Sequence, residues 1–326
     1  MSDHPEYLEY AIGLDIGGTN MVAGVIACAD GRVVSRHTVP TDSNNGPEDG
    51  LRRMADLIDQ VLDMAHVGRA DTVGIGIGCS GPVDPATGRV HNPYTLPGWD
   101  GLPIVDHLTA TFDLPAYIVG DAQCAALGEH WIGAGKGSRH MIYITVGTGI
   151  GGAVIVDARL HQGTRQAAGE VGHQVIDING PFCYCGARGC LEMLAAAPAI
   201  TQFAVENAPQ GSLLLAMVAG DRAQITPQLV SRAANQGDPF SRKMMQRVAF
   251  YLGTGIANLI NILAPELIVM GGGVMQSWSL LAPGILDTVA KRAAMVPVDD
   301  IKIVPAKLGL NAGITGGARL VLDRRS

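Results

Sequence analysis

The sequence predicts an α/β protein in which two copies of one domain each contain a mixed β-sheet flanked by helices. The chain opens with three strand-like runs, YAIGLDIGGT, VAGVIA and RVVSRHTV, separated by glycine-containing turns. A near copy of this antiparallel meander recurs at residues 141–163, MIYITVGTGIGGAVIVDARLHQG. Repetition of one supersecondary unit indicates a duplicated domain. Helical patterns that alternate with strands after the meander favour mixed sheets covered by helices.

The individual elements follow from their apolar periodicity. The three opening runs alternate apolar and polar residues, as antiparallel strands do. Residues 72–78, TVGIGIG, predict a short buried strand, and residues 241–264 predict a long helix that Pro265 ends before the strand ELIVM. Residues 51–65 predict a helix docked on a sheet, with one apolar face made by Leu51, Met54, Ile58, Val61, Leu62 and Ala65.

The repeat also suggests where the domains divide. Residues 1–119 together with a C-terminal helix at 311–326 are expected to form a smaller α/β domain. Residues 120–310 are expected to form a larger α/β domain that contains a cysteine-rich loop.

Composition narrows the class of protein. The 326 residues are 47% hydrophobic and 16% charged, which is typical of a globular chain, and the net charge of -7 argues against a nucleic-acid partner. No apolar run is long enough for a membrane span, and the N-terminus lacks the features of a signal peptide. We therefore expect a cytoplasmic protein, in which clustered cysteines bind metal rather than form disulfides. The scattered cysteines are expected in the core: Cys28, Cys79 and Cys124.

The motif DIGGTN, residues 15–20, combines a strand-end carboxylate with a glycine turn. Without side chains at Gly17 and Gly18, backbone N–H groups can approach an anion, and Thr19 can add a donor. Asp15 could then hold Mg²⁺ or its waters beside phosphates. A plain structural hairpin is the alternative interpretation.

A second glycine turn, GTGIGG at residues 147–152, offers Thr148 and Gly149 without an acidic residue. Together the two turns could form a pair of phosphate-binding hairpins that share one metal. The glycines of GGGV, residues 271–274, follow a strand and could let a nucleotide lie against the backbone. The chain has no GxxxxGK[ST] motif, so it is not a P-loop protein.

Asp121 follows a predicted strand and precedes a helix expected to begin near Ala122. One interpretation is a helix N-cap. The functional interpretation is a general base that accepts a proton from a substrate hydroxyl as its oxygen attacks phosphorus. The two roles can coexist.

The segment GPFCYCGARGCLE, residues 180–192, holds three of the six cysteines. With His173 they make a Cys₃His set suited to a structural Zn²⁺, which leaves no open position for metal catalysis. The glycines at 186 and 189 allow the sharp turn that brings the thiolates together. The predicted ligands are His173, Cys183, Cys185 and Cys190.

Two glutamates flank this predicted zinc loop, Glu170 and Glu192. Either could be solvated or paired. Carboxylates held still by a metal loop are better explained as acceptors for the hydroxyls of a polyol.

Taken together, these motifs resemble the ROK family of sugar kinases, and most closely its bacterial-type glucokinases. DIGGTN, SGPVD, NPYTLPGW, GDAQCAALGE, GTGIGG, GEVGH, CYCGARGCLE and GGGV occur along essentially the whole chain in the family's order. The resemblance implies the actin-like, ribonuclease H-like ATPase fold, with a cleft between the domains. Family members with N-terminal DNA-binding extensions act as repressors, but the first strand begins near Tyr7 and we expect a kinase.

The resemblance also implies roles for individual residues. Asp121 would be the catalytic base toward the 6-hydroxyl of glucose, and His173 would use one ring nitrogen for zinc and one for sugar. The sugar-binding set would be Gly81, Asn92, Gly120, Asp121, Glu170, His173 and Glu192. The set for ATP and Mg²⁺ would be Asp15, Gly17, Gly18, Thr19, Thr148, Gly149 and Gly272. A dimer or tetramer is expected, and no membrane partner.

One departure from the family affects the expected substrate. Family glucokinases usually have Asn-Asp where this chain has Gly120-Asp121. They also have a second Asn two residues after that Asp, where this chain has Gln123. Losing one amide hydrogen bond to sugar costs about 0.5–1.5 kcal/mol. Mannose, fructose or an N-acetylhexosamine such as N-acetylmannosamine are therefore alternatives to glucose, as is a sensing protein without turnover. ADP and polyphosphate stay open as phosphoryl donors, and Asn311 replaces a commonly acidic position with less obvious consequence.

Overall fold

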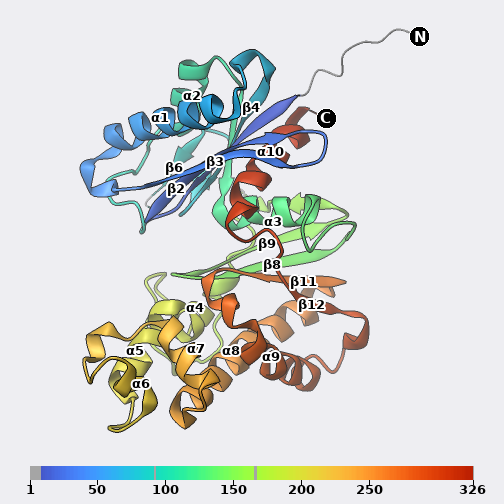
Figure 1. Ribbon diagram of the computed structural model, residues 1–326. Helices are drawn as coiled ribbons and strands as arrows, with labels where there is room; N and C mark the ends of the chain where they lie inside the picture. Colours follow the sequence, from blue (N-terminus) through green and yellow to red (C-terminus); the bar gives the residue numbers. More distant parts are fainter. Residues whose placement is uncertain (1–8, 92, 165–166, 326) are drawn as a thin grey trace. The chain divides into compact units, whose positions relative to one another are not determined.

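The computed structural model describes residues 9–91, 93–164 and 167–325, and residue contacts divide the chain into two units (Figure 1). Unit 1 consists of Met1–Arg139, Ala153–Ala168 and Ala306–Ser326, and unit 2 of His140–Gly152 and Gly169–Pro305. The domain boundary that the sequence places near residue 119 stays a prediction.

The sheet of unit 1 begins with the predicted meander. Its strand order is β3-β2-β1-β4-β7, with β2 antiparallel to β1 and β3, and with β4 parallel to β1 and β7. The strands are β1 (Tyr10–Ile16), β2 (Asn20–Ala27), β3 (Val33–Pro40), β4 (Thr72–Cys79) and β7 (Ala116–Gly120). A separate two-stranded ribbon pairs β5 (Val83–Asp84) with β6 (Arg89–Val90).

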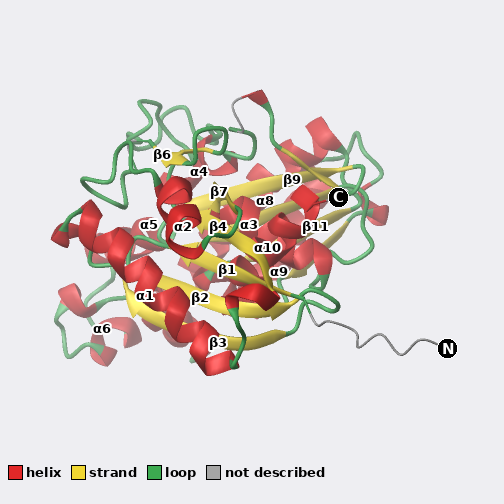
Figure 2. Cartoon of the chain, turned by 90° about the horizontal axis from the view of Figure 1, so that it is seen from above, coloured by secondary structure: helices red, strands yellow, loops and turns green. Residues whose placement is uncertain are grey.

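The helices of unit 1 pack against the strands of this sheet. The helices of unit 1 are α1 (Pro47–Ala65), α2 (Ile104–Phe112), α3 (Asp121–Trp131) and α10 (Ala312–Arg325). Figure 2 shows α1 running along β2 and β3, which it contacts. The predicted helix is confirmed but begins at Pro47 rather than residue 51, because Pro favours a first helical turn. Leu57 is buried on its packed face, whereas Leu51 and Ala65 are partly exposed.

The C-terminal helix α10 packs against β1, β4 and α3 (Figure 1). Its backbone lies very close to the backbone of the two strands. A Cβ atom on Gly13 of β1 would fall 1.8 Å from the Ile314 carbonyl oxygen, and one on Gly76 of β4 would fall 1.8 Å from that of Gly317. Glycine is therefore required at both strand positions. This close packing brings the start of α10 to the end of β1 that carries Asp15.

Unit 2 contains most of the second sheet, whose strand order is β10-β9-β8-β11-β12. Strands β8 and β12 are parallel to β11, and β10 is antiparallel to β9. The division between the two units falls within β9. The strands are β8 (Met141–Val146), β9 (Ile150–Val156), β10 (Arg159–His161), β11 (Leu267–Gly271) and β12 (Lys302–Pro305).

The apolar core of unit 2 lies between its strands and its helices. The helices are α4 (Leu191–Ala195), α5 (Ala197–Asn207), α6 (Leu213–Met217), α7 (Pro227–Asn235), α8 (Pro239–Leu263) and α9 (Trp278–Arg292). Asp238 caps α8 by accepting hydrogen bonds from the N–H of Ser241 at 2.9 Å and from its hydroxyl at 2.7 Å. The helix ends before Pro265, as predicted. None of the described helices, α8 included, has the length and hydropathy that crossing a membrane requires.

Candidate active site

The turn between β1 and β2 is tight and exposed. The N–H of Gly17 donates to the carbonyl of Asn20 at 3.0 Å, and the Thr41 hydroxyl donates to the Gly17 carbonyl at 2.6 Å. A Cβ atom on Gly18 would meet the side chain of Thr95 at 2.9 Å, so the position favours glycine. Gly18 and Thr19 are both exposed. The turn therefore presents backbone and a hydroxyl at the surface of unit 1.

Asp15 lies at the end of β1, directly before this turn. Burial, then the negative charge of Asp121, raises the pKa of Asp15 to about 7, and the charge of Arg36 partly offsets this. A Cβ atom on Gly313 would lie 2.3 Å from Asp15 Oδ2, so the start of α10 closes one side of the carboxyl group. A divalent cation would relieve the repulsion between the two carboxylates, and the oxygen donors suit Mg²⁺.

Asp121 is the first residue of α3, whose N-cap is Gly120. The N-cap interpretation of Asp121 is therefore wrong by one position, because β7 continues through Gly120 and the helix begins at Asp121 itself. The Asp121 Oδ1 atom accepts a hydrogen bond from the N–H of Ala122 at 2.7 Å. The fold of unit 1 thus brings the carboxylates of two strand ends into electrostatic contact.

The expected core positions of two cysteines are confirmed beside this pair. Cys79 and Cys124 are buried, and burial followed by the charges of the two aspartates raises the pKa of each thiol well above its ordinary value. Cys28 is only partly buried. The two buried thiols are protonated and unreactive at neutral pH.

Gly120 has no side chain of its own, and Gln123 holds its backbone. The Gln123 Oε1 atom accepts from the N–H of Gly120 at 3.3 Å, and Nε2 donates to the carbonyl of Ala168 at 3.1 Å. The carboxamide therefore fixes the backbone that precedes Asp121. Gly81 has a φ of 95° and lies against Pro93, where a Cβ atom would be 2.8 Å away. Asn92, also predicted to bind sugar, lies outside the described residues.

In unit 2, the turn between β8 and β9 forms the second glycine hairpin. The N–H of Gly147 donates to the carbonyl of Gly149 at 2.8 Å, and Thr148 is exposed. The N–H of Ile150 donates to Glu192 Oε2 at 2.7 Å, and a Cβ atom on Gly149 would lie 2.5 Å from the same oxygen. The buried Glu192 carboxylate of α4 is therefore fixed against this hairpin.

The third predicted glycine site follows β11. Gly272 has a φ of 90°, and a Cβ atom there would lie 2.4 Å from the carbonyl oxygen of Val146 in β8. The residue is exposed. Any larger side chain would be strained, so this backbone stays accessible at the end of β11.

Glu170 and His173 flank a single turn of 3₁₀ helix, Val171–His173. The N–H of His173 donates to the carbonyl of Glu170 at 3.1 Å, and the Glu170 side chain is exposed. A Cβ atom on Gly172 would lie 2.0 Å from the carbonyl oxygen of Ile150, so this turn packs directly on β9. The histidine, Glu192 and the hairpin are thereby held within one small region of unit 2.

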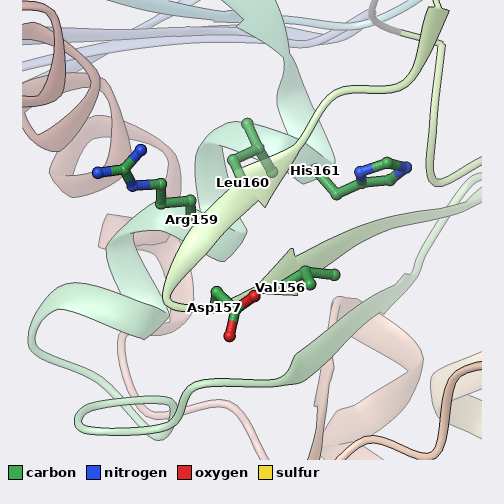
Figure 3. A pocket seen from close by; sticks show the side chains of 5 residues that line it. All are labelled: Val156, Asp157, Arg159, Leu160 and His161. Atoms are coloured by element: carbon green, nitrogen blue, oxygen red, sulfur yellow. The ribbon is translucent and has the colours of Figure 1, made fainter.

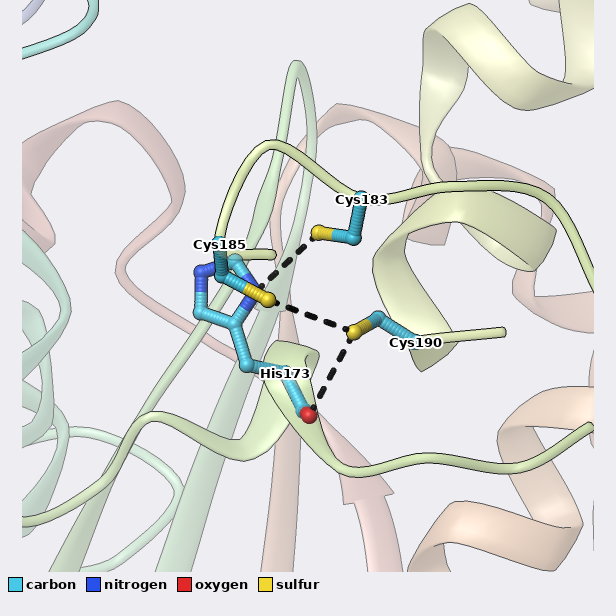
Figure 4. A group of neighbouring side chains, drawn as sticks. All are labelled: His173, Cys183, Cys185 and Cys190. Atoms are coloured by element: carbon cyan, nitrogen blue, oxygen red, sulfur yellow. Dashed lines mark hydrogen bonds between the residues drawn. The ribbon is translucent and has the colours of Figure 1, made fainter. Parts of the chain in front are cut away.

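The four predicted metal ligands converge (Figure 4). One ligand atom from each of His173, Cys183, Cys185 and Cys190 lies within 4.8 Å of all the others. The Cys185 and Cys190 sulfur atoms are 3.6 Å apart, and Cys183 Sγ is 3.5 Å from His173 Nδ1. Tetrahedral Zn²⁺ with ordinary bond lengths separates two sulfur ligands by about 3.8 Å and sulfur from nitrogen by about 3.6 Å. The arrangement fits a tetrahedral ion.

Electrostatics in this loop also favour a cation. Burial raises the pKa of the Cys190 thiol to about 12 and raises that of Cys183, whereas a backbone hydrogen bond from Ala187 lowers that of Cys185. Three converging thiols resist joint ionisation unless a cation compensates their charge. Both predicted turn glycines adopt positive φ, 95° at Gly186 and 69° at Gly189.

A hollow of about 570 Å³ lies at the β9–β10 hairpin (Figure 3). The side chains around it are Val156, Asp157, Arg159, Leu160 and His161. None of the predicted site residues lines it, and Asp157 forms an ion pair with Arg139 at 2.7 Å. The hollow therefore adds nothing to the catalytic chemistry.

Glu129, the last residue of the motif GDAQCAALGE, has a structural role that the sequence does not predict. Its fully buried carboxylate accepts from the N–H groups of Ala134 at 2.7 Å, Lys307 at 2.9 Å and Leu308 at 2.7 Å. It thus joins the end of α3 to the segment that leads into α10. One feature of the sequence could have indicated this role: Glu129 lies in a predicted helix and has no Lys or Arg close to it along the chain, so its charge needs another partner if it is buried.

The chain is similar to known proteins over almost its whole length. A family model described as the ROK family matches residues 11–324. The chain is 36% identical over 317 residues to the glucokinase of Halalkalibacterium halodurans. The aligned region covers 97% of this chain and 96% of that protein. It is 30% identical over 312 residues to a xylose repressor of Caldicellulosiruptor bescii, which covers 96% of this chain and 78% of the repressor.

A solved ROK family glucokinase from Streptomyces griseus, in complex with glucose and AMPPNP, has a TM-score of 0.83 at 30% identity. The similarity covers 96% of this chain and 99% of that one. The actin-like α/β fold implied by the sequence motifs is thereby confirmed. With a family match across almost its whole length, the chain belongs to the ROK family.

Proposed function

We propose that this chain is a sugar kinase that transfers the γ-phosphoryl group of ATP to the 6-hydroxyl of glucose. Membership of the ROK family and the glucokinases among its relatives support sugar phosphorylation. The observation that carries the proposal is the electrostatic contact between Asp15 and Asp121 at two strand ends of unit 1. Such a pair supplies both a metal-holding carboxylate and a base.

In this mechanism Asp121 accepts the proton of the sugar's 6-hydroxyl group. The hydroxyl oxygen of the sugar attacks the γ-phosphorus of ATP at the same time, and ADP leaves. Asp121 begins α3 and is oriented by its bond with the N–H of Ala122. A fixed carboxylate at this position lowers the cost of forming an alkoxide-like oxygen.

The other sugar hydroxyls would be bound by Glu170, His173 and Glu192 of unit 2. Glu192 is buried and already bonded to the hairpin backbone, so its second oxygen is held in a defined position. Carboxylate and imidazole groups that are fixed in this way suit a polyol. Gly81, Asn92 and Gly120 would also bind the sugar.

The glycine turns would bind the nucleotide, through the set Asp15, Gly17, Gly18, Thr19, Thr148, Gly149 and Gly272. Asp15 would hold Mg²⁺ or its waters, and the ion would neutralise charge on the phosphates when bound. The raised pKa of Asp15 supports this role, because the site favours added positive charge.

The cysteine cluster would hold a structural Zn²⁺ through His173, Cys183, Cys185 and Cys190. The four donors, their spacing and the loop electrostatics support zinc. With His173 Nδ1 on the metal, its Nε2 atom would point toward the sugar. The ion would thus fix a sugar ligand rather than take part in phosphoryl transfer.

Gly120 favours a second candidate within the same chemistry. Glycine at position 120 has no side chain, so it cannot supply the amide that the family's usual Asn offers to a sugar hydroxyl. Another hexose or an N-acetylhexosamine, such as mannose, fructose or N-acetylmannosamine, could then be preferred. A protein that senses sugar without turnover is the alternative from another class.

A coupled ADP-release assay with Mg·ATP tests these candidates on glucose, mannose, fructose, N-acetylglucosamine and N-acetylmannosamine. The highest turnover on glucose supports the main proposal, and the highest turnover on another sugar makes Gly120 a mark of altered specificity. Absence of turnover on every sugar favours the sensor. Asp121→Asn should lower kcat about 10²- to 10⁴-fold without unfolding the protein. Substantial residual activity would refute its role as base.

Three further expectations stay predictions. They are the cytoplasmic location, assembly into a dimer or tetramer, and the domain division into residues 1–119 with 311–326 and residues 120–310. The phosphoryl donor range, including ADP and polyphosphate, is tested by measuring the sugar phosphate formed with each donor, because only ATP releases ADP.

A further inference from the structure

Tyr184 lies between two of the predicted zinc ligands, and the proposed function gives it no role. Tyr184 is 59% exposed, and Phe182 on the same loop is 68% exposed. The loop backbone around it is fixed, since the N–H of Cys183 donates to the carbonyl of Ala187 at 2.8 Å and that of Gly186 donates to Cys183 at 3.0 Å. The tyrosine ring is therefore carried on a rigid base but is itself accessible to water.

The Tyr184 hydroxyl is directed at His173. It lies 3.2 Å from His173 Nε2, the ring nitrogen that faces away from the cysteine cluster. The two rings meet edge to face, with centroids 5.2 Å apart and an angle of 87° between their planes. The tyrosine therefore covers the ring nitrogen that the proposed function assigns to sugar.

Glu192 also acts on this hydroxyl: burial, then the charge of the Glu192 carboxylate and hydrogen bonding to it, raise the pKa of Tyr184. With His173 Nδ1 on the proposed zinc ion, Nε2 would carry the ring proton and would donate to the Tyr184 oxygen. The phenolic O–H would then donate to the Glu192 carboxylate. One hydroxyl would thus accept from an imidazole and donate to a carboxylate.

A sugar hydroxyl bound by these two residues would make the same pair of hydrogen bonds. We propose that the Tyr184 hydroxyl occupies a sugar-hydroxyl position between His173 and Glu192 in the sugar-free protein, and that the sugar must displace it. This inference rests on the proposed function, which assigns both residues to sugar. Tyr184 would then keep the two polar groups paired before substrate arrives, at the cost of weaker sugar binding.

The exposure of the side chain makes displacement feasible. A tyrosine with 59% of its surface in solvent can rotate its ring outward without opening a cavity in the core. The displaced Tyr184 hydroxyl then hydrogen-bonds to water. The net free-energy cost of displacement is therefore that of exchanging one or two ordinary hydrogen bonds within the protein for bonds to water.

Removing only the hydroxyl tests the inference. Tyr184→Phe should lower the dissociation constant for glucose about two- to tenfold, measured by titration calorimetry without nucleotide, because the sugar no longer competes with an internal bond. Tyr251→Phe on α8 removes a hydroxyl elsewhere in unit 2 and should leave the constant unchanged. Zinc content equal to that of the wild type checks that the loop is intact in both variants.

The outcomes separate this inference from the proposed function. If the wild type binds glucose and Tyr184→Phe binds it equally or less tightly, the inference is overturned while the kinase proposal stands. If the wild type and Tyr184→Phe bind none of the five sugars of the panel, both fail. Tighter binding by Tyr184→Phe alone supports the displacement.

Discussion

Replacing Asp15 with Asn should stabilise the protein while abolishing its activity. The fold raises the pKa of Asp15 from 3.8 to about 7, chiefly through burial and then through the charge of Asp121. Each unit of pKa shift corresponds to about 1.4 kcal/mol, so the ionised carboxylate costs the native state up to about 4 kcal/mol. The residue is partly exposed, and solvent screening lowers the expected gain in the Asn variant to about 2–4 kcal/mol.

The pH dependence follows from the direction of this shift. Between pH 3.8 and about 7 the native protein holds a proton on Asp15 that the unfolded chain has released. Stability of the wild type therefore falls as pH rises through this window, and the penalty is complete above pH 7. Asn mimics the protonated form, so the advantage of the variant should be largest at pH 8 and less than half as large at pH 5.

Urea unfolding at both pH values measures this difference. The buffer should lack Mg²⁺ and nucleotide, and it should contain no chelator, because a chelator would remove the zinc ion proposed for the cysteine loop. Asp63→Asn, which removes an exposed carboxylate from α1, is the matched control and should show no such gain. A variant at position 15 that is no more stable than the wild type at pH 8 would refute the argument from burial and charge.

Three further predictions concern particular contacts. Gly149→Ala should raise the sugar KM at least about fivefold, because its Cβ atom would lie 2.5 Å from Glu192 Oε2, whereas Gly147→Ala in the same turn meets nothing within 4 Å and should leave the KM unchanged. Cys185→Ser should lose zinc, measured by metal analysis, and lower the melting temperature; a stable, active, zinc-free variant would contradict the ligand assignment. Glu129→Gln should lower the free energy of unfolding by about 2–3 kcal/mol in urea titrations, since a carboxamide cannot satisfy three backbone donors, and an unchanged value would disprove this anchoring role.

Much of the fold could be predicted from the sequence because its signals are local. Alternating apolar residues and glycine turns predict β1 to β3 and β8 to β10, and Pro265 marks the end of α8 within two residues. The spacing of the cysteines, with glycines at 186 and 189, predicts a turn that both residues make with positive φ. Errors occur at boundaries: α1 begins earlier at Pro47, and Asp121 begins α3 rather than capping it.

The sequence by itself determined the strand and helix pattern, the family resemblance and the candidate ligands, because those features depend on neighbours along the chain. Only the tertiary structure decided which distant groups share an environment. The raised pKa of Asp15 depends on its burial and on the charges of Asp121 and Arg36, which come from the start of α3 and from β3. The bond between Tyr184 and His173 joins the loop to the turn before it. Electrostatic energies and hydrogen bonds depend on distances in space, which residue spacing does not fix.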